Sequence, residues 1–176
     1  YDIVRELDPS GEPIRGGRKI NEAAAVVVRR IFTEFANGKS PAAIARQLNA
    51  ESISGSNGRP WQGGTISGHS RRRTGILRNE TYVGRLVWNR QHFVKDPASG
   101  KRVARLNPES QWIVHEIPEL RIVDDELWRK VAERLEDREA SPRARKVRAS
   151  RFWEKRRPGY LLTGLILDSV LGEHHA

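Results

Sequence analysis

Three consecutive arginines, Arg71, Arg72 and Arg73, lie in the segment GTISGHSRRRTGILRN at residues 64–79. Neighbouring guanidinium groups repel one another, and the repulsion is relieved when water solvates them or when an anion binds them. A guanidinium can clamp a phosphate or form two hydrogen bonds to a guanine edge. The segment therefore indicates contact with a polyanion, and a solvated charged surface is the purely structural alternative.

Other residue types that carry chemistry lack the spacing that their chemistry requires. None of the five histidines fits a metal motif such as H-E-x-x-H, cysteine is absent, and no Walker-type phosphate loop or G-x-S-x-G motif occurs. The adjacent acids at 124–126 are typical of the first turn of a helix. We therefore predict no catalytic residue, no metal and no cofactor.

The charge of the chain also favours an anionic partner. The 176 residues include 32 Lys+Arg and 22 Asp+Glu, which gives a formal net charge of +10. Residues 59–105 hold eleven of the basic residues and only two acidic ones. A charge of this sign predicts binding to nucleic acid first and to an anionic membrane surface second. Because the sequence has no apolar run of membrane-spanning length, no signal peptide and no cysteine, we expect no membrane insertion and a cytoplasmic location.

Local patterns predict three helices in the first half of the chain. Asn21 and Ser40 are favourable N-caps for helices that end near residues 37 and 50. Thr65 is predicted to cap a third helix that runs to about Asn79, so that the second and third helices form a helix-turn-helix-like pair. Helical spacing predicts that the first helix buries five residues: Ala24, Val28, Ile31, Phe32 and Phe35.

The second half changes to a strand pattern. Alternation over residues 82–95 predicts one strand, the turn at 96–100 predicts a returning strand over 101–106, and residues 111–117 predict a third strand. Asp124 is predicted to cap a final helix, and the turn-rich residues 1–20 predict a hairpin or ordered arm. The fold class is therefore α+β, with a helical first half, a small antiparallel β-sheet and a further helix in the second half.

The basic composition of residues 138–157 differs from that of the rest of the chain and predicts a linker or an exposed helix. This division gives a DNA-binding domain over 1–137, the basic segment, and a tail over 158–176. Polar and basic residues of the third helix, its flanks, the strands and the basic segment are the predicted DNA-binding residues: Arg59, Thr65, Ser67, His69, Ser70, Arg71, Arg72, Arg73, Arg78, Arg85, Arg90, Lys101, Arg102, Arg145, Lys146 and Arg148.

Several motifs occur in the order found in a known family. The segments GGRKINEAAAVVVRRIFTEFANGKSPAAIARQLNAESI, GRPW, TGILRNETYVGRLVWNRQHFVKD and ELRIVDDELWRKVAERL together resemble the recombinase domain of large serine recombinases, which include phage integrases, transposases and invertase-like proteins. The resemblance implies a bacterial or phage protein whose recombinase domain binds one half of an attachment site in double-stranded DNA. It also implies that a separate resolvase-like domain carries the catalytic serine, so that this chain does no chemistry alone.

Two further expectations follow from the resemblance. The parent protein would act as a dimer or tetramer on DNA, whereas the isolated chain, which begins at Tyr1 and contains no methionine, would be a monomeric fragment. The segment RRPGYLLTGLI resembles the approach to a zinc ribbon, yet DSVL at 168–171 replaces the expected Cys-x-x-Cys. We therefore expect residues 158–176 to be a truncated ribbon or a disordered tail that binds no zinc.

Other function classes remain open on the sequence alone. A helix-turn-helix transcriptional regulator with a basic extension would dimerise on a palindrome. A nuclease or other hydrolase would require the acids at 124–126 to bind a metal ion. A general polyanion or membrane-surface binder would show no preference for DNA sequence.

Overall fold

The computed structural model describes residues 1–4, 6–7, 9–14, 16–55, 58–97 and 99–150. The chain divides into two compact units, Tyr1–Arg134 and Leu135–Ala176. Helices and short antiparallel strands occur together, which confirms the predicted α+β class. In the described part of the chain, no helix combines the length and apolar character needed to cross a bilayer. The predicted tail at 158–176 lies outside the described residues, and the predicted domain limits stay a prediction.

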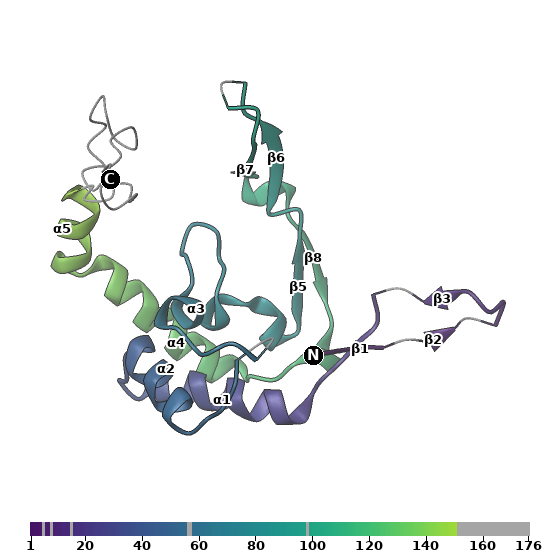
Figure 1. Ribbon diagram of the computed structural model, residues 1–176, viewed down its shortest axis with the longest axis horizontal. Helices are drawn as coiled ribbons and strands as arrows, with labels where there is room; N and C mark the ends of the chain where they lie inside the picture. Colours follow the sequence, from purple (N-terminus) through teal and green to yellow (C-terminus); the bar gives the residue numbers. More distant parts are fainter. Residues whose placement is uncertain (5, 8, 15, 56–57, 98, 151–176) are drawn as a thin grey trace, which may run out of the picture. The chain divides into compact units, whose positions relative to one another are not determined.

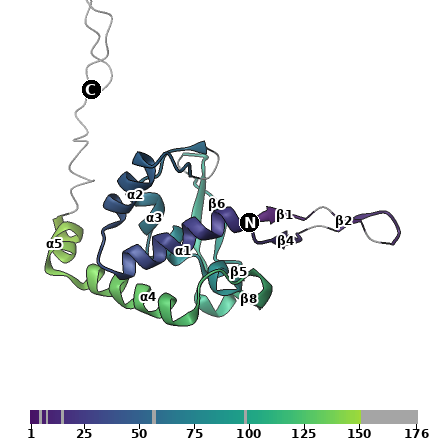
Figure 2. The ribbon, with the colours of Figure 1, turned by 90° about the horizontal axis from the view of Figure 1, so that it is seen from below.

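The first two helices form where the sequence places them, because their end signals are local. α1 (Glu22–Ala36) begins after Asn21, whose side chain accepts a hydrogen bond from the Ala24 amide at 3.0 Å. α2 (Pro41–Ala50) begins after Ser40, which caps it in the same way, and it packs against α1 (Figure 2). The prediction that Ala24 is buried was wrong. Ala24 is exposed, and the buried residues of α1 are Ala25, Val28, Ile31, Phe32 and Phe35.

The N-terminal segment is a paired arm, as predicted. β1 (Asp2–Ile3) pairs with β4 (Arg18–Lys19), and β2 (Glu6–Leu7) pairs with β3 (Pro13–Ile14), both antiparallel (Figure 1). The phenol of Tyr1 connects the arm to the core, because it donates to the carbonyl oxygens of Thr81 at 3.0 Å and Leu120 at 2.8 Å. Its burial raises the pKa of this phenol above the ordinary value.

The predicted third helix is much shorter than expected. α3 spans only Gly63–Ser67, packs against α2, and has no side-chain cap from its N-cap residue Gln62. The prediction that Thr65 caps a helix reaching Asn79 was therefore wrong. The physical reason is the backbone at Gly68, whose φ of 63° ends the helix, followed by Gly75 with a φ of 102°. After this second glycine the chain forms two short 3₁₀ segments, η2 (Ile76–Arg78) and η3 (Glu80–Val83).

The strand region is two separate ribbons, where the sequence suggested one small sheet. β5 (Arg85–Trp88) pairs with β8 (Ile113–Glu116), and β6 (Gln91–Lys95) pairs with β7 (Arg102–Leu106). The single strand predicted over 82–95 is wrong, because η3 occupies its start and Asn89, with a φ of 56°, breaks it. Figure 1 shows the β6–β7 ribbon continuing beyond the β5–β8 ribbon. Two 3₁₀ segments, η4 (Glu109–Gln111) and η5 (Pro118–Leu120), flank β8.

The last two helices carry the end of the described chain. α4 (Asp125–Ala140) begins after Asp124, whose carboxylate accepts a hydrogen bond from the Leu127 amide at 2.7 Å, as predicted. Within the first unit its Trp128 stacks on Phe32 at 5.8 Å between ring centroids. In the second unit, Ser141 precedes α5 (Pro142–Ser150) and caps it by accepting from the Ala144 amide at 3.3 Å.

Candidate nucleic-acid interface

The three arginines lie on a narrow hairpin loop, residues 68–75, which we call the arginine loop (Figure 1). His69 and Thr74 form an isolated antiparallel bridge, with backbone hydrogen bonds of 3.2 and 3.3 Å. The amide of Arg73 donates to the carbonyl of Ser70 at 3.0 Å and closes a turn at the tip. The loop therefore presents its tip residues on a backbone-bonded frame.

Two glycines make the base of the arginine loop possible. A Cβ on Gly68 would lie 1.5 Å from the Thr74 carbonyl oxygen, and a Cβ on Gly75 would lie 2.4 Å from the Gly68 Cα. Real side chains do not reach such separations, so the two backbones approach this closely only because both residues are glycine.

The structure separates the three arginines into two roles. Arg73 is bound to the rest of the domain, because its guanidinium lies 2.7 Å from Glu109 and 3.6 Å from Glu80. Arg71 and Arg72 are exposed, and in the described part of the chain neither has a hydrogen bond or an ion pair. These two guanidinium groups are therefore available to an anion, whereas Arg73 positions the loop that carries them.

A buried carboxylate organises the arginines around the loop. Glu80, only 6% exposed, accepts Arg90 at 2.9 Å, Arg85 at 3.4 Å and Arg73 at 3.6 Å. Arg85 also pairs with Glu116 at 3.3 Å, across the β5–β8 ribbon. One buried negative charge surrounded by three cations holds these side chains in fixed positions.

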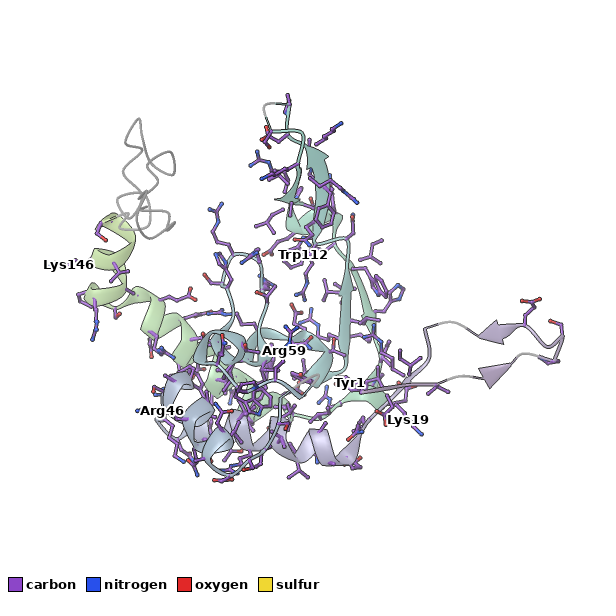
Figure 3. The ribbon with its side chains drawn as sticks, in the orientation of Figure 1. Tyr1, Lys19, Arg46, Arg59, Trp112 and Lys146 are labelled. Atoms are coloured by element: carbon purple, nitrogen blue, oxygen red, sulfur yellow. The ribbon has the colours of Figure 1, made fainter. Side chains whose placement is uncertain are left out.

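Trp112 connects the arginine loop to the base of the β6–β7 ribbon. The guanidinium carbons of Arg73 and Arg90 lie 4.8 and 5.4 Å from its ring centroid, within cation–π range. Arg90 also donates to the Arg73 carbonyl at 3.1 Å. Figure 3 shows Trp112 where the β5–β8 ribbon meets the β6–β7 ribbon.

Burial changes the electrostatics of Arg90 but not its charge at neutral pH. Burial is the main cause that lowers the pKa of its guanidinium; Glu80 opposes the change, and the charges of Arg73 and Arg85 add to it. An arginine starts from so high a pKa that it stays protonated. Among the described residues its Nε is a buried donor without a partner. Arg90 therefore acts within the Glu80 cluster as a fixed cation.

The remaining predicted residues of the first half do not gather on one helix face. Ser67 donates to the Gly63 carbonyl at 3.0 Å within α3, and Arg78 donates to the Ser67 carbonyl at 3.2 Å, so both support the fold around α3. Thr65 is an exposed residue of α3. Arg59 is exposed on the loop after α2, where its carbonyl accepts the Gly55 amide at 2.9 Å.

The β6–β7 ribbon carries the predicted residue Arg102, and the predicted residue Lys101 lies in its turn. The side chain of Arg102 stacks over Phe93, with its guanidinium carbon 4.9 Å from the ring centroid. Two further cations, Lys95 and Arg105, lie on the same ribbon and were missing from the predicted set. Lys95 lies directly opposite Arg102, and Arg105 lies opposite His92, a register that is not visible in the sequence.

The predicted residues of the basic segment lie on α5 in the second unit. Arg145 and Lys146 are exposed there, and Figure 3 labels Lys146 on this helix. For Arg148 only its position in α5 is described.

The acids at 124–126 have structural roles. Asp124 caps α4, Asp125 pairs with Arg121 at 2.6 Å, and Glu126 pairs with Lys130 at 2.7 Å. The hydrogen bond from Lys130 is the main cause that lowers the pKa of Glu126. Across the described ranges no three His, Cys, Asp or Glu residues come together in a group that could hold a metal ion. These contacts give the nuclease interpretation no support.

Comparison with known proteins identifies the domain. The model of the Recombinase family matches residues 22–138, about two thirds of the chain. No curated protein and no solved structure matches the chain. A domain of this type implies an interaction with DNA and supports a role in site-specific recombination. The chain therefore belongs to the Recombinase family, as the order of its motifs predicted.

Proposed function

We propose that this domain binds double-stranded attachment-site DNA for a large serine recombinase and does no chemistry by itself. In the parent protein a separate domain would supply the catalytic serine, and cleavage and rejoining would pass through a phosphoserine linkage. The parent would act as a dimer or tetramer on DNA, with the isolated chain a monomer. Family membership supports the role in recombination, and the arginine loop supports the contact with DNA.

The single observation that carries the proposal is the difference between Arg73 and its two neighbours. Glu80 and Glu109 neutralise Arg73 and fix the loop, yet no described carboxylate pairs with Arg71 or Arg72. A loop built only for solubility would not need a buried acid beneath it. Two unpaired guanidinium groups on a backbone-bonded loop are complementary in charge to the phosphates of a nucleic-acid backbone.

The helix-turn-helix regulator is less well supported. A regulator of that class reads the major groove with residues of its second helix. Here α3 ends at Ser67, so His69 and all three arginines follow the helix and do not lie on it. Presentation of the cations by a loop fits phosphate contact better than base reading by a recognition helix.

Salt dependence of duplex binding tests the proposal. Fluorescence anisotropy with a mixed-sequence duplex should show that Arg71→Ala/Arg72→Ala lowers the slope of log K against log salt by about 1.8, since each phosphate contact contributes about 0.9. A matched control is Arg129→Ala/Lys130→Ala, which removes two exposed cations from α4 and changes the net charge equally. Equal slopes for the two double variants would show that the loop does not contact phosphates.

A further inference from the structure

The β6–β7 ribbon exposes apolar residues that an isolated domain would normally cover. Phe93, Val94 and Leu106 are 53%, 45% and 40% exposed, and every residue of β6 is exposed. A two-stranded ribbon has too little core to be stable without support, and clustered exposed apolar residues mark a binding surface. The ribbon therefore has the character of an element that binds a partner.

Charge identifies the partner. Four cations lie on the ribbon and its turn, and in the described part of the chain none of them has an ion pair: Lys95, Lys101, Arg102 and Arg105. The ribbon's one acid, Asp96, accepts a hydrogen bond from Ser99. A second copy of the same surface would bring like charges together, whereas a polyanion is complementary to it.

The register places apolar and basic groups together on both faces. Phe93 lies opposite Ala104 and next to the Lys95–Arg102 pair, while Val94 lies opposite Val103 on the other face. A two-stranded β-ribbon fits into the major groove of B-DNA, where apolar side chains can contact thymine methyl groups and flanking cations can reach phosphates. The face that carries Phe93, Lys95 and Arg102 therefore fits a ribbon with base edges in front of it and a phosphate backbone on each side.

We infer that the β6–β7 ribbon enters the major groove of the same duplex that the arginine loop contacts, with the face that carries Phe93 toward the base edges, and that Phe93 reads thymine methyl groups there. The inference rests on the proposed function. It assigns base discrimination to the ribbon and leaves phosphate contact to Arg71 and Arg72.

The base of the ribbon is rigid enough for this role. Buried Asn107 donates to the backbone carbonyl and the side-chain oxygen of Asn89 at 2.8 and 3.0 Å, so the two strands are joined where the ribbon begins. The indole of Trp112 donates to the Asn107 carbonyl at 3.2 Å and also stacks with Arg73 of the arginine loop. The two elements therefore share one support and can address one duplex together.

Selection from a pool of random duplexes tests the inference with the full chain. The wild-type chain should enrich a motif that contains thymines, and Phe93→Ala should lose preference at those positions while keeping the wild-type salt slope. The matched control is Val94→Ala, which truncates an exposed apolar residue on the opposite face of the same ribbon. This control should enrich the wild-type motif.

A second measurement does not depend on the variant folding. Replacing single thymines of the enriched motif by uracil removes only the methyl group, and each contacted methyl should weaken wild-type binding about fourfold, the effect of one buried carbon. No effect of uracil at any position, or an unchanged motif for Phe93→Ala, overturns the inference. The inference also fails if the wild-type chain self-associates and Phe93→Ala abolishes this self-association without changing the preference for a DNA sequence.

The two proposals fail differently. If the wild-type chain binds no duplex, the proposed function fails and the inference fails with it. If Arg71→Ala/Arg72→Ala lowers the salt slope while the thymine methyl groups have no effect, only the inference fails.

Discussion

Replacing Glu80 by Gln should destabilise the Tyr1–Arg134 unit by about 3 kcal/mol. Removing one partner of a buried ion pair typically costs about 3–5 kcal/mol, because the other charge stays buried without compensation. Arg90 is the least exposed of its three partners, with a side chain that is 20% exposed, and lies at 2.9 Å. Arg73 and Arg85 are partly exposed and regain water when the carboxylate is lost, so the lower end of that range applies.

The melting temperature measures this effect. Unfolding entropy near the midpoint is about 2.1 cal/mol/K per residue. For a unit that spans Tyr1–Arg134, a loss of ~3 kcal/mol lowers the melting temperature by about 10 °C. Glu133→Gln is the matched control, since it makes the same chemical change at an exposed residue that lies 3.9 Å from Arg129. It should shift the midpoint by no more than about 2 °C.

Duplex binding separates two interpretations of Glu80. Both Gln variants raise the net charge by one, so binding governed by overall charge alone would strengthen equally in both. If Glu80 positions the arginine loop, Glu80→Gln should instead weaken binding at a temperature where the variant is still folded. Tighter binding by Glu80→Gln, or a melting temperature equal to that of the Glu133→Gln control, would refute the role given to this carboxylate.

Two further variants test the frame and the acid sensitivity of the fold. Gly68→Ala should lower the free energy of unfolding by at least ~2 kcal/mol, because the added Cβ meets the Thr74 carbonyl and the backbone conformation is almost exclusive to glycine. The control Gly64→Ala, whose Cβ would lie in open space, should leave stability unchanged or raise it, as measured by urea titration. Equal stabilities of the two variants would contradict the close approach at the base of the loop. The hydrogen bond from Arg30 is the main cause that lowers the pKa of Glu51 from 4.5 to about 2. The carboxylate therefore stabilises the folded state above pH 4.5, and this contribution is lost as the pH falls from 4.5 to about 2, so Glu51→Gln should reduce the loss of stability in that window. A carboxyl-carbon NMR titration of Glu51 with a midpoint near the ordinary value would contradict the assignment.

Local signals in the sequence predicted the parts of the fold that local physics determines. Asn21, Ser40 and Asp124 cap their helices because a short polar side chain reaches an amide three residues ahead, a contact that needs no other part of the chain. The turn at 96–100 between β6 and β7 is local in the same sense. The order of motifs also identified the family.

Long-range geometry decided the rest. A glycine inside a helical pattern can be tolerated or can end the helix, and the sequence does not show that Gly68 and Gly75 approach each other with positive φ. The central position of Glu80 depends on cations before and after it in the chain, and Trp112 looked like an ordinary strand residue. The split into two ribbons depends on the left-handed backbone of Asn89, which strand propensity does not report.

The closure of the arginine loop has a consequence for divergence within the family. Backbone hydrogen bonds, two glycines and the side chain of Arg73 close the loop, so the side chains of Arg71 and Arg72 contribute nothing to keeping it shut. Positions 71 and 72 can then accumulate substitutions at little cost to folding. A domain built this way can strengthen or weaken its phosphate contacts, in nature or by directed evolution, while its scaffold stays the same.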